Sequence, residues 1–249
     1  MPSFIGQIIE SYRLTFIFII SAFPLLCLPI FFEGLQHIAE VKLGMFAASG
    51  LEDFGDEAQR KRLVFGVFKV FSLLAMTIFL PRYFIHGRDL KRSLSFSSKA
   101  LRAVIIGCVF MAALMLWMFL LGPWIFGLLI ENASMKQKYL WPLIAGILIC
   151  FPLQTRTNAW MAAVFDDKPL SMQENQNLKK AMMGMMAPVI LIPILPLMAL
   201  HYFLNLQSMG QPLNVLWGLL TLDSLIVGVL ATLMGASFYV VYRDARASA

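Results

Sequence analysis

The longest uncharged run of this chain constrains its fold more than any other feature. From Ala181 to Leu222 the sequence contains no Asp, Glu, Lys or Arg. A transmembrane helix needs about 20 apolar residues, so this run is long enough for more than one crossing. The turn-forming segment Gln207–Pro212 interrupts it. The run therefore predicts two membrane helices that fold back on each other at this turn.

The rest of the chain is also rich in apolar residues and poor in charge. Charged residues make up only 14% of the chain and hydrophobic residues 59%, whereas roughly 25% of an ordinary soluble domain is charged. Such a chain cannot cover its apolar surface with polar groups. We expect an all-α, polytopic helical bundle that forms a single integral membrane domain over residues 1–249. Its six expected spans are approximately 14–32, 64–84, 103–130, 139–165, 181–205 and 215–242.

The distribution of basic residues predicts the orientation. With six spans, 12 of the 20 basic residues fall on the side of both termini, and six fall on the other side. Short loops rich in Lys and Arg stay in the cytoplasm. We therefore expect a multi-pass protein of a bacterial inner membrane, with both termini cytoplasmic and the long loop Glu33–Lys61 outside. The cluster Arg60–Arg62 argues the other way. The net charge of +6 is read as a membrane feature, and no nucleic-acid partner is expected.

Spans two, four and six end in similar charged segments. These segments begin at Arg88, Asp166 and Arg243, which are 78 and 77 residues apart, and a Leu-Ser pair follows the first two, at 94–95 and 170–171. This spacing favours a three-hairpin internal repeat joined by cytoplasmic elbow helices. The alternative is that any span ending at the cytoplasmic face acquires basic residues there.

Three short segments have local helix signals. Residues 3–13 are amphipathic and are expected to lie in the inner interface before the first span. A second amphipathic stretch, Leu35–Phe46, lies in the long outer loop. Ser171 and Glu174 have the spacing of a capping box, which predicts the start of the second elbow helix.

These segments carry a family resemblance. Residues 4–13, the two Leu-Ser elbows and the closing segment Tyr242–Arg246 resemble a broad bacterial group of membrane proteins. That group includes the membrane domain attached to some glycerophosphodiester phosphodiesterases and stand-alone relatives of the YciC-like kind. The resemblance implies a six-helix bundle and no agreed activity. The phosphodiesterase barrel has no counterpart in this sequence, so its chemistry is not implied.

Polar residues inside apolar spans are the candidate functional residues, because charges in lipid are costly. Arg156 lies ten residues before Asp166, about 15 Å along a helix, and Gln154 and Asn158 flank it. The functional interpretation is contact with an anion, a lipid headgroup or a substrate inside the bundle. The alternative is a snorkelling or internally paired arginine.

Lys69 and Asp223 are two further candidates. Asp223 is expected near the outer interface, and a Lys69–Asp223 pair between spans two and six is one hypothesis. The alternative is that Lys69 snorkels outward. His37 and His201 are expected to share the outer interface, either without a ligand or, in the less favoured alternative, as the two ligands of a haem.

No catalytic, metal-binding or cofactor-binding motif occurs in the sequence, so no cofactor is expected. We expect a non-catalytic accessory or scaffold subunit that binds membrane lipids or a larger membrane complex. Small residues of span six, such as Gly228 and Gly235, favour close helix packing within the bundle or against a partner. The alternative function is a small-molecule or ion transporter or channel with Arg156 lining the pathway.

Overall fold

The computed structural model describes residues 3–47, 56–117, 121–130, 141, 144–145, 160–167, 171–182 and 186–248. These residues form helices and turns, and they contain no strand. The helices are α1 (Phe4–Ser21), α2 (Phe23–Lys42), α3 (Asp56–Ile85), α4 (Leu90–Leu94), α5 (Ser98–Leu116), α6 (Gly122–Leu129), α8 (Met172–Met182), α9 (Met186–Gln207) and α10 (Leu213–Ser248). The predicted all-α class is confirmed for this part of the chain.

Five helices in the described residues are long and apolar enough to cross a membrane. They are α1, the segment 64–85 of α3, α5, the segment 188–207 of α9 and the segment 213–247 of α10. By the length and composition of its helices, the structure agrees with a helical membrane bundle at this coarse level. The sixth span and the internal repeat stay predictions, and most of the expected span 139–165 lies outside the described residues.

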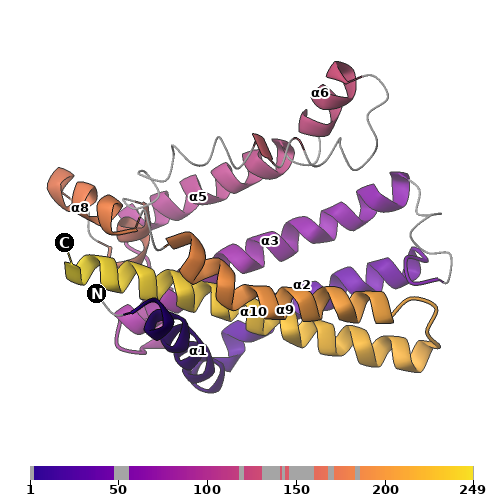
Figure 1. Ribbon diagram of the computed structural model, residues 1–249, viewed down its shortest axis with the longest axis horizontal. Coiled ribbons are helices and arrows are strands. Elements are labelled where there is room, and N and C mark those ends of the chain that lie inside the picture. The colour runs from indigo at the N-terminus through magenta and orange to yellow at the C-terminus, as the bar shows by residue number, and fades with distance from the viewer. Residues whose placement is uncertain are drawn as a thin grey trace. The chain divides into compact units, whose positions relative to one another are not determined.

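The chain forms two compact units, residues 1–94 with 180–249, called unit 1, and residues 95–179, called unit 2. In unit 1, α10 is the central helix and contacts α1, α2, α3 and α9. Helices α9 and α10 are antiparallel (Figure 1). The predicted turn between them is confirmed, because α9 ends at Gln207 and α10 begins at Leu213. Gly210 has φ 68 in this turn, and its N–H donates to the Phe46 carbonyl at 2.9 Å.

The first apolar run differs from the expectation. Residues 14–32 are divided between α1 and α2, which meet at Ala22 with φ −134 and ψ 32. Pro24 explains the break, because it has no N–H to donate to the Ile20 carbonyl and its ring would clash with that carbonyl in a continuous helix. The expected loop from residue 33 also differs, since α2 continues to Lys42 and α3 begins at Asp56.

Two glycines allow α10 to approach its neighbours closely. A Cβ at Gly228 would lie 2.6 Å from Ile30 Cγ1, and a Cβ at Gly235 would lie 2.7 Å from the Met76 carbonyl oxygen. The small-residue stripe is therefore used inside unit 1, against α2 and α3. An apolar core surrounds it, formed by Leu14, Phe18, Ala22, Met76, Leu80, Tyr83, Ala231, Ala236 and Val240.

The beginning of α1 lies beside the end of α10. Gln7 Nε2 donates to Asp244 Oδ2 at 3.0 Å, and Arg243 Nη1 donates to Glu10 Oε1 at 3.2 Å. In Figure 1 this end of unit 1 is on the left, and the α9–α10 turn is on the right. Unit 1 therefore has one end that holds the first and last helical turns of the chain and an opposite end that holds the α9–α10 turn.

Of the two predicted elbow helices, the second begins where the sequence predicts. Ser171 N–H donates to Glu174 Oε2 at 2.8 Å and Glu174 N–H donates to Ser171 Oγ at 3.2 Å, so the capping box before α8 is confirmed. The first elbow differs. Ser97 Oγ accepts from the Ala100 N–H at 3.1 Å and caps α5 directly. The polar residues expected to form a separate helix there are instead the first turn of α5.

In unit 2, the indole of Trp160 lies against α5. Its Nε1 donates to the Ala103 carbonyl at 2.6 Å. A Cβ at Gly107 would come within 2.8 Å of this ring. The glycine therefore leaves the space that the indole occupies.

Candidate functional site

The polar face of α2 points into unit 1. Glu33, Gln36, His37 and Glu40 are spaced three and four residues apart, which places them on one side of the helix. All four side chains are buried, while Ile38 is exposed. Because α2 packs against α3 and α10, this face meets polar residues from those helices and from α9.

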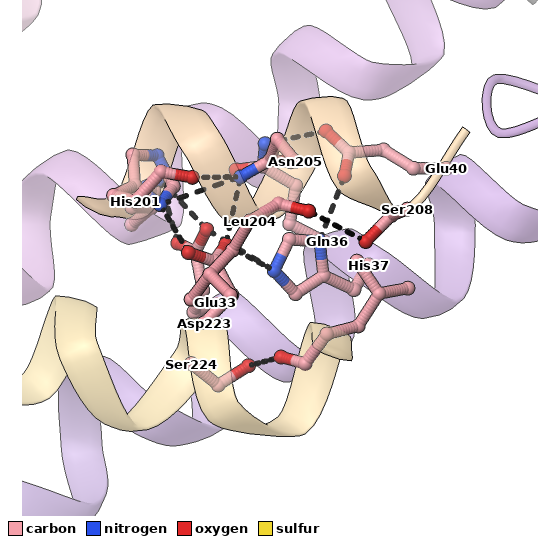
Figure 2. Close-up of polar contacts among 12 residues, drawn as sticks. Glu33, Gln36, His37, Glu40, His201, Leu204, Asn205, Ser208, Asp223 and Ser224 are labelled. Carbon is pink, nitrogen blue, oxygen red and sulfur yellow. Dashed lines mark hydrogen bonds and ion pairs between the residues drawn. The ribbon is translucent and has the colours of Figure 1, made fainter. Parts of the chain in front are cut away.

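Asp223 of α10 is the centre of this arrangement and is 0% exposed. Its Oδ2 accepts from His37 Nε2 and from Asn205 Nδ2, both at 2.9 Å. Its Oδ1 lies 2.6 Å from His201 Nδ1. Figure 2 shows the His37, His201 and Asn205 side chains converging on Asp223. Two histidines from different helices, α2 and α9, thus share one buried carboxylate.

His37 bridges two carboxylates. Its Nδ1 lies 2.9 Å from Glu40 Oε2 and its Nε2 lies 2.9 Å from Asp223 Oδ2. An ionised carboxylate can only accept hydrogen bonds, so both ring nitrogens must donate if both acids are ionised. That protonation state is the imidazolium. The geometry thus places a positive charge between Glu40 and Asp223.

Two basic side chains of α3 complete the arrangement. Lys69 Nζ lies 2.7 Å from Glu33 Oε2 and 2.9 Å from Glu33 Oε1. Arg62 Nε donates to Glu40 Oε1 at 2.5 Å, and Gln36 Nε2 donates to the same oxygen at 2.7 Å. The Arg62 side chain is 44% exposed, so it joins the buried groups to the surface of unit 1.

We call this set the polar network. It comprises Glu33, Gln36, His37, Glu40, Arg62, Lys69, His201, Asn205 and Asp223. The three carboxylates face the basic side chains of Lys69 and Arg62 and the His37 imidazolium, so acidic and basic groups are equal in number. Buried ions are costly unless they are paired and hydrogen-bonded. The network meets this requirement with groups from four helices.

The structure places two of the five residues singled out in the sequence in this network. Lys69 and Asp223 both belong to it, but they do not pair with each other, so the hypothesis of a Lys69–Asp223 pair, one of two left open by the sequence, is wrong. Lys69 pairs with Glu33, and Asp223 is held by histidines and Asn205. Lys69 meets a nearer carboxylate because α2 extends past the predicted span end and carries Glu33 alongside α3. Arg156, Gln154 and Asn158 lie outside the described residues.

Sequence reasoning missed Glu33, Gln36, Glu40, Arg62 and Asn205. The signal was present, because the polar residues of α2 recur at helical spacing. The stretch beginning at Leu35 was interpreted as an amphipathic helix in a loop, with its polar side in water. In the structure the polar side faces the bundle.

The network also contains atoms of the types that bind metals. Glu33, His201 and Asp223 each offer one ligand atom, and these three atoms lie within 4.8 Å of one another. One imidazole nitrogen and two carboxylate oxygens form a mixed set of ligands. The same groups are proton donors and acceptors, so the site can bind protons as well as cations.

Comparison of the chain with protein families, curated proteins and solved structures found no match. The resemblance to the YciC-like group stays a prediction. The function is therefore inferred from the geometry of the polar network.

Proposed function

We propose that this protein is a small, non-catalytic membrane carrier or channel for protons or cations, and that the polar network is its binding centre. One observation carries the proposal. Asp223 is fully buried in the segment of α10 that is apolar enough to cross a membrane, and two histidines from other helices share its carboxylate.

The free-energy cost of burying the Asp223 carboxylate supports this proposal. Ionisable side chains within membrane helices are expensive and are typical of ion pathways and proton relays. Histidine is the side chain that gains or loses a proton most readily near neutral pH. A carboxylate that contacts both His37 and His201 can pass a proton or a cation from one to the other. Arg62, at the exposed edge of the network, marks where the network approaches the surface.

The accessory function predicted from sequence loses part of its support. Two features favoured docking to a partner, namely the small-residue stripe of span six and the long loop after the first span. The surface of α10 at Gly228 is covered by α2, and its surface at Gly235 is covered by α3, within unit 1. Residues 33–42 belong to α2 and contribute to the network. These glycines and residues 33–42 are therefore used inside unit 1, and the accessory function becomes the alternative outcome of the test.

The location and partners belong to the same proposal. We place the protein in a bacterial inner membrane with both termini in the cytoplasm, and membrane lipids are its surroundings. The basic residues support this orientation through the positive-inside rule. The contacts between the beginning of α1 and the end of α10 agree with termini on one side.

Ion flux into liposomes tests the proposal. The purified chain is reconstituted with a pH-sensitive or a zinc-sensitive dye inside, and a membrane potential is imposed, negative inside. We expect entry of protons or of divalent metal ions above the level of empty liposomes. Asp223→Asn should abolish this entry. Glu10→Gln is the matched control, because Glu10 pairs with Arg13 and Arg243, outside the network.

Two outcomes overturn the proposal. One is the absence of flux for every ion tested in liposomes that contain folded protein. The other is a flux that Asp223→Asn leaves unchanged. Absence of flux together with migration in a larger assembly on native gels would favour the accessory function instead.

A further inference from the structure

We propose that Glu33, His201 and Asp223 form a binding site for a divalent transition-metal ion. This inference rests on the proposed function, since it names the cation that the polar network takes. The three residues come from α2, α9 and α10, so a single ion would join three helices of unit 1.

The distances are close to those of a metal site. The three ligand atoms lie within 4.8 Å of one another. Two ligands bound at about 2.1 Å from one ion lie no more than about 4.2 Å apart. The three atoms are therefore within about 1 Å of a separation that one ion can bridge.

The types of ligand atom select the class of metal. Imidazole nitrogen suits zinc, iron, copper and nickel, and carboxylate oxygen suits manganese, magnesium and calcium. A set with one nitrogen and two oxygens fits Zn²⁺, Fe²⁺, Mn²⁺ or Co²⁺ better than Ca²⁺ or Mg²⁺, which prefer six or more oxygens. The site contains no thiolate ligand, which argues against a site for Cu⁺. A divalent transition metal is therefore the expected ion.

His37 and Asn205 orient the Asp223 carboxylate through hydrogen bonds, as the residues around a metal site orient its ligands. His37 Nε2 and Asn205 Nδ2 both bond to Oδ2 at 2.9 Å. This leaves Oδ1 directed at His201, at 2.6 Å. Hydrogen bonds of this kind fix the orientation of metal-binding carboxylates. The oxygen that faces His201 is thus the one available to an ion.

One buried acceptor of the polar network lacks a partner. Gln36 Oε1 is a buried acceptor without a hydrogen-bond partner in the described part of the chain. Its amide lies within the network, because Gln36 Nε2 donates to Glu40 Oε1 at 2.7 Å. Buried acceptors without donors are rare in folded proteins. A water molecule in the network, bound to an ion or free, would supply the missing donor.

Lys69 supplies a test that depends on the metal. Its ammonium group lies 2.7 Å from Glu33 Oε2, so it competes with an ion for this carboxylate. If Glu33 is a ligand, Lys69→Met should tighten metal binding. A network with a structural role alone gives no reason for a gain in affinity.

The experiment measures binding at equilibrium. The full chain in detergent micelles is stripped with a chelator and titrated with Co²⁺, whose visible absorption reports the ligand geometry, and Zn²⁺ is then added in competition. We expect one Co²⁺ per chain, displaced by Zn²⁺ and not by an excess of Mg²⁺. Asp223→Asn and His201→Gln should weaken binding by about 100-fold or more, since loss of an outer-shell group alone costs roughly 10- to 100-fold. Glu10→Gln should leave binding unchanged.

The outcomes separate this inference from the proposed function. Absence of saturable Co²⁺ binding, or binding that His201→Gln leaves intact, overturns the metal site, while proton flux in liposomes can still support the carrier. Metal binding without any flux supports the site and overturns the carrier. If the ligand variants fail to fold, as judged by gel filtration and circular dichroism, Lys69→Met decides. A higher affinity supports the site, and an equal or lower affinity contradicts it.

Discussion

Replacement of Gly235 by alanine tests the close packing of α10 against α3, two of the helices that carry the polar network. An added Cβ would lie 2.7 Å from the Met76 carbonyl oxygen and 3.2 Å from Leu80 Cβ. Real Cβ atoms essentially never come within 3.0 Å of another heavy atom of this kind. Since the nearest atom is backbone, α3 itself must move. Overpacking of this sort costs about 1–3 kcal/mol, and the better helix propensity of alanine returns about 1 kcal/mol.

We therefore expect Gly235→Ala to lower the free energy of unfolding by up to about 2 kcal/mol, after these two effects are combined. The measurement is reversible unfolding in mixed micelles, followed by circular dichroism. Gly218→Ala is the matched control, because Gly218 is in the same helix and a Cβ there would meet nothing within 4 Å. The control should be neutral or stabilising. Equal effects of the two substitutions would refute the proposed contact between α10 and α3.

Three further predictions concern the network, the elbow and the topology. His37→Leu removes the donor shared by two buried carboxylates and should lower the free energy of unfolding by about 3–5 kcal/mol. Ile38→Leu, on the exposed side of α2, is the control. Equal stability of the two variants would contradict the imidazolium bridge. Ser171→Ala should destabilise the first turn of α8 by about 1 kcal/mol, seen as faster amide hydrogen exchange there alone. Single cysteines at Glu52 and Lys91 should be labelled from opposite sides of the membrane, and labelling of both from one side would exclude the predicted orientation.

Some local features of this fold could be predicted because their causes are local. The turn between α9 and α10 follows from Gly210 and Pro212, which interrupt an apolar run too long for one helix. The start of α8 follows from the Ser171–Glu174 capping box. The break at Ala22 has an equally local cause in Pro24. That cause was visible in the sequence, but the uncharged run across it favoured one continuous span.

The polar network could not be predicted in the same way, because the same hydropathy pattern places the polar face of a helix on opposite sides in water and in lipid. In a soluble protein the polar face of α2 would lie in solvent. In a membrane bundle the apolar face meets lipid and the polar face turns inward. His37 and Glu40 could be assigned inward only once α3 and α10 were known to cover that side. The partners of Lys69 and Asp223 depended on that assignment.

The charge balance of the network predicts that binding of a cation releases a proton. Glu33, Glu40 and Asp223 are matched by Lys69, Arg62 and the His37 imidazolium. A divalent ion adds two positive charges to a buried site, and an uncompensated buried charge is strongly destabilising. Loss of the proton of the His37 imidazolium, which contacts Asp223 and Glu40, is the available compensation. Addition of Zn²⁺ to the stripped protein in weakly buffered solution should therefore acidify it by about one proton per ion bound, and binding should weaken as the pH falls. His37→Gln should reduce the number of protons released. Binding without proton release would contradict this assignment of charges.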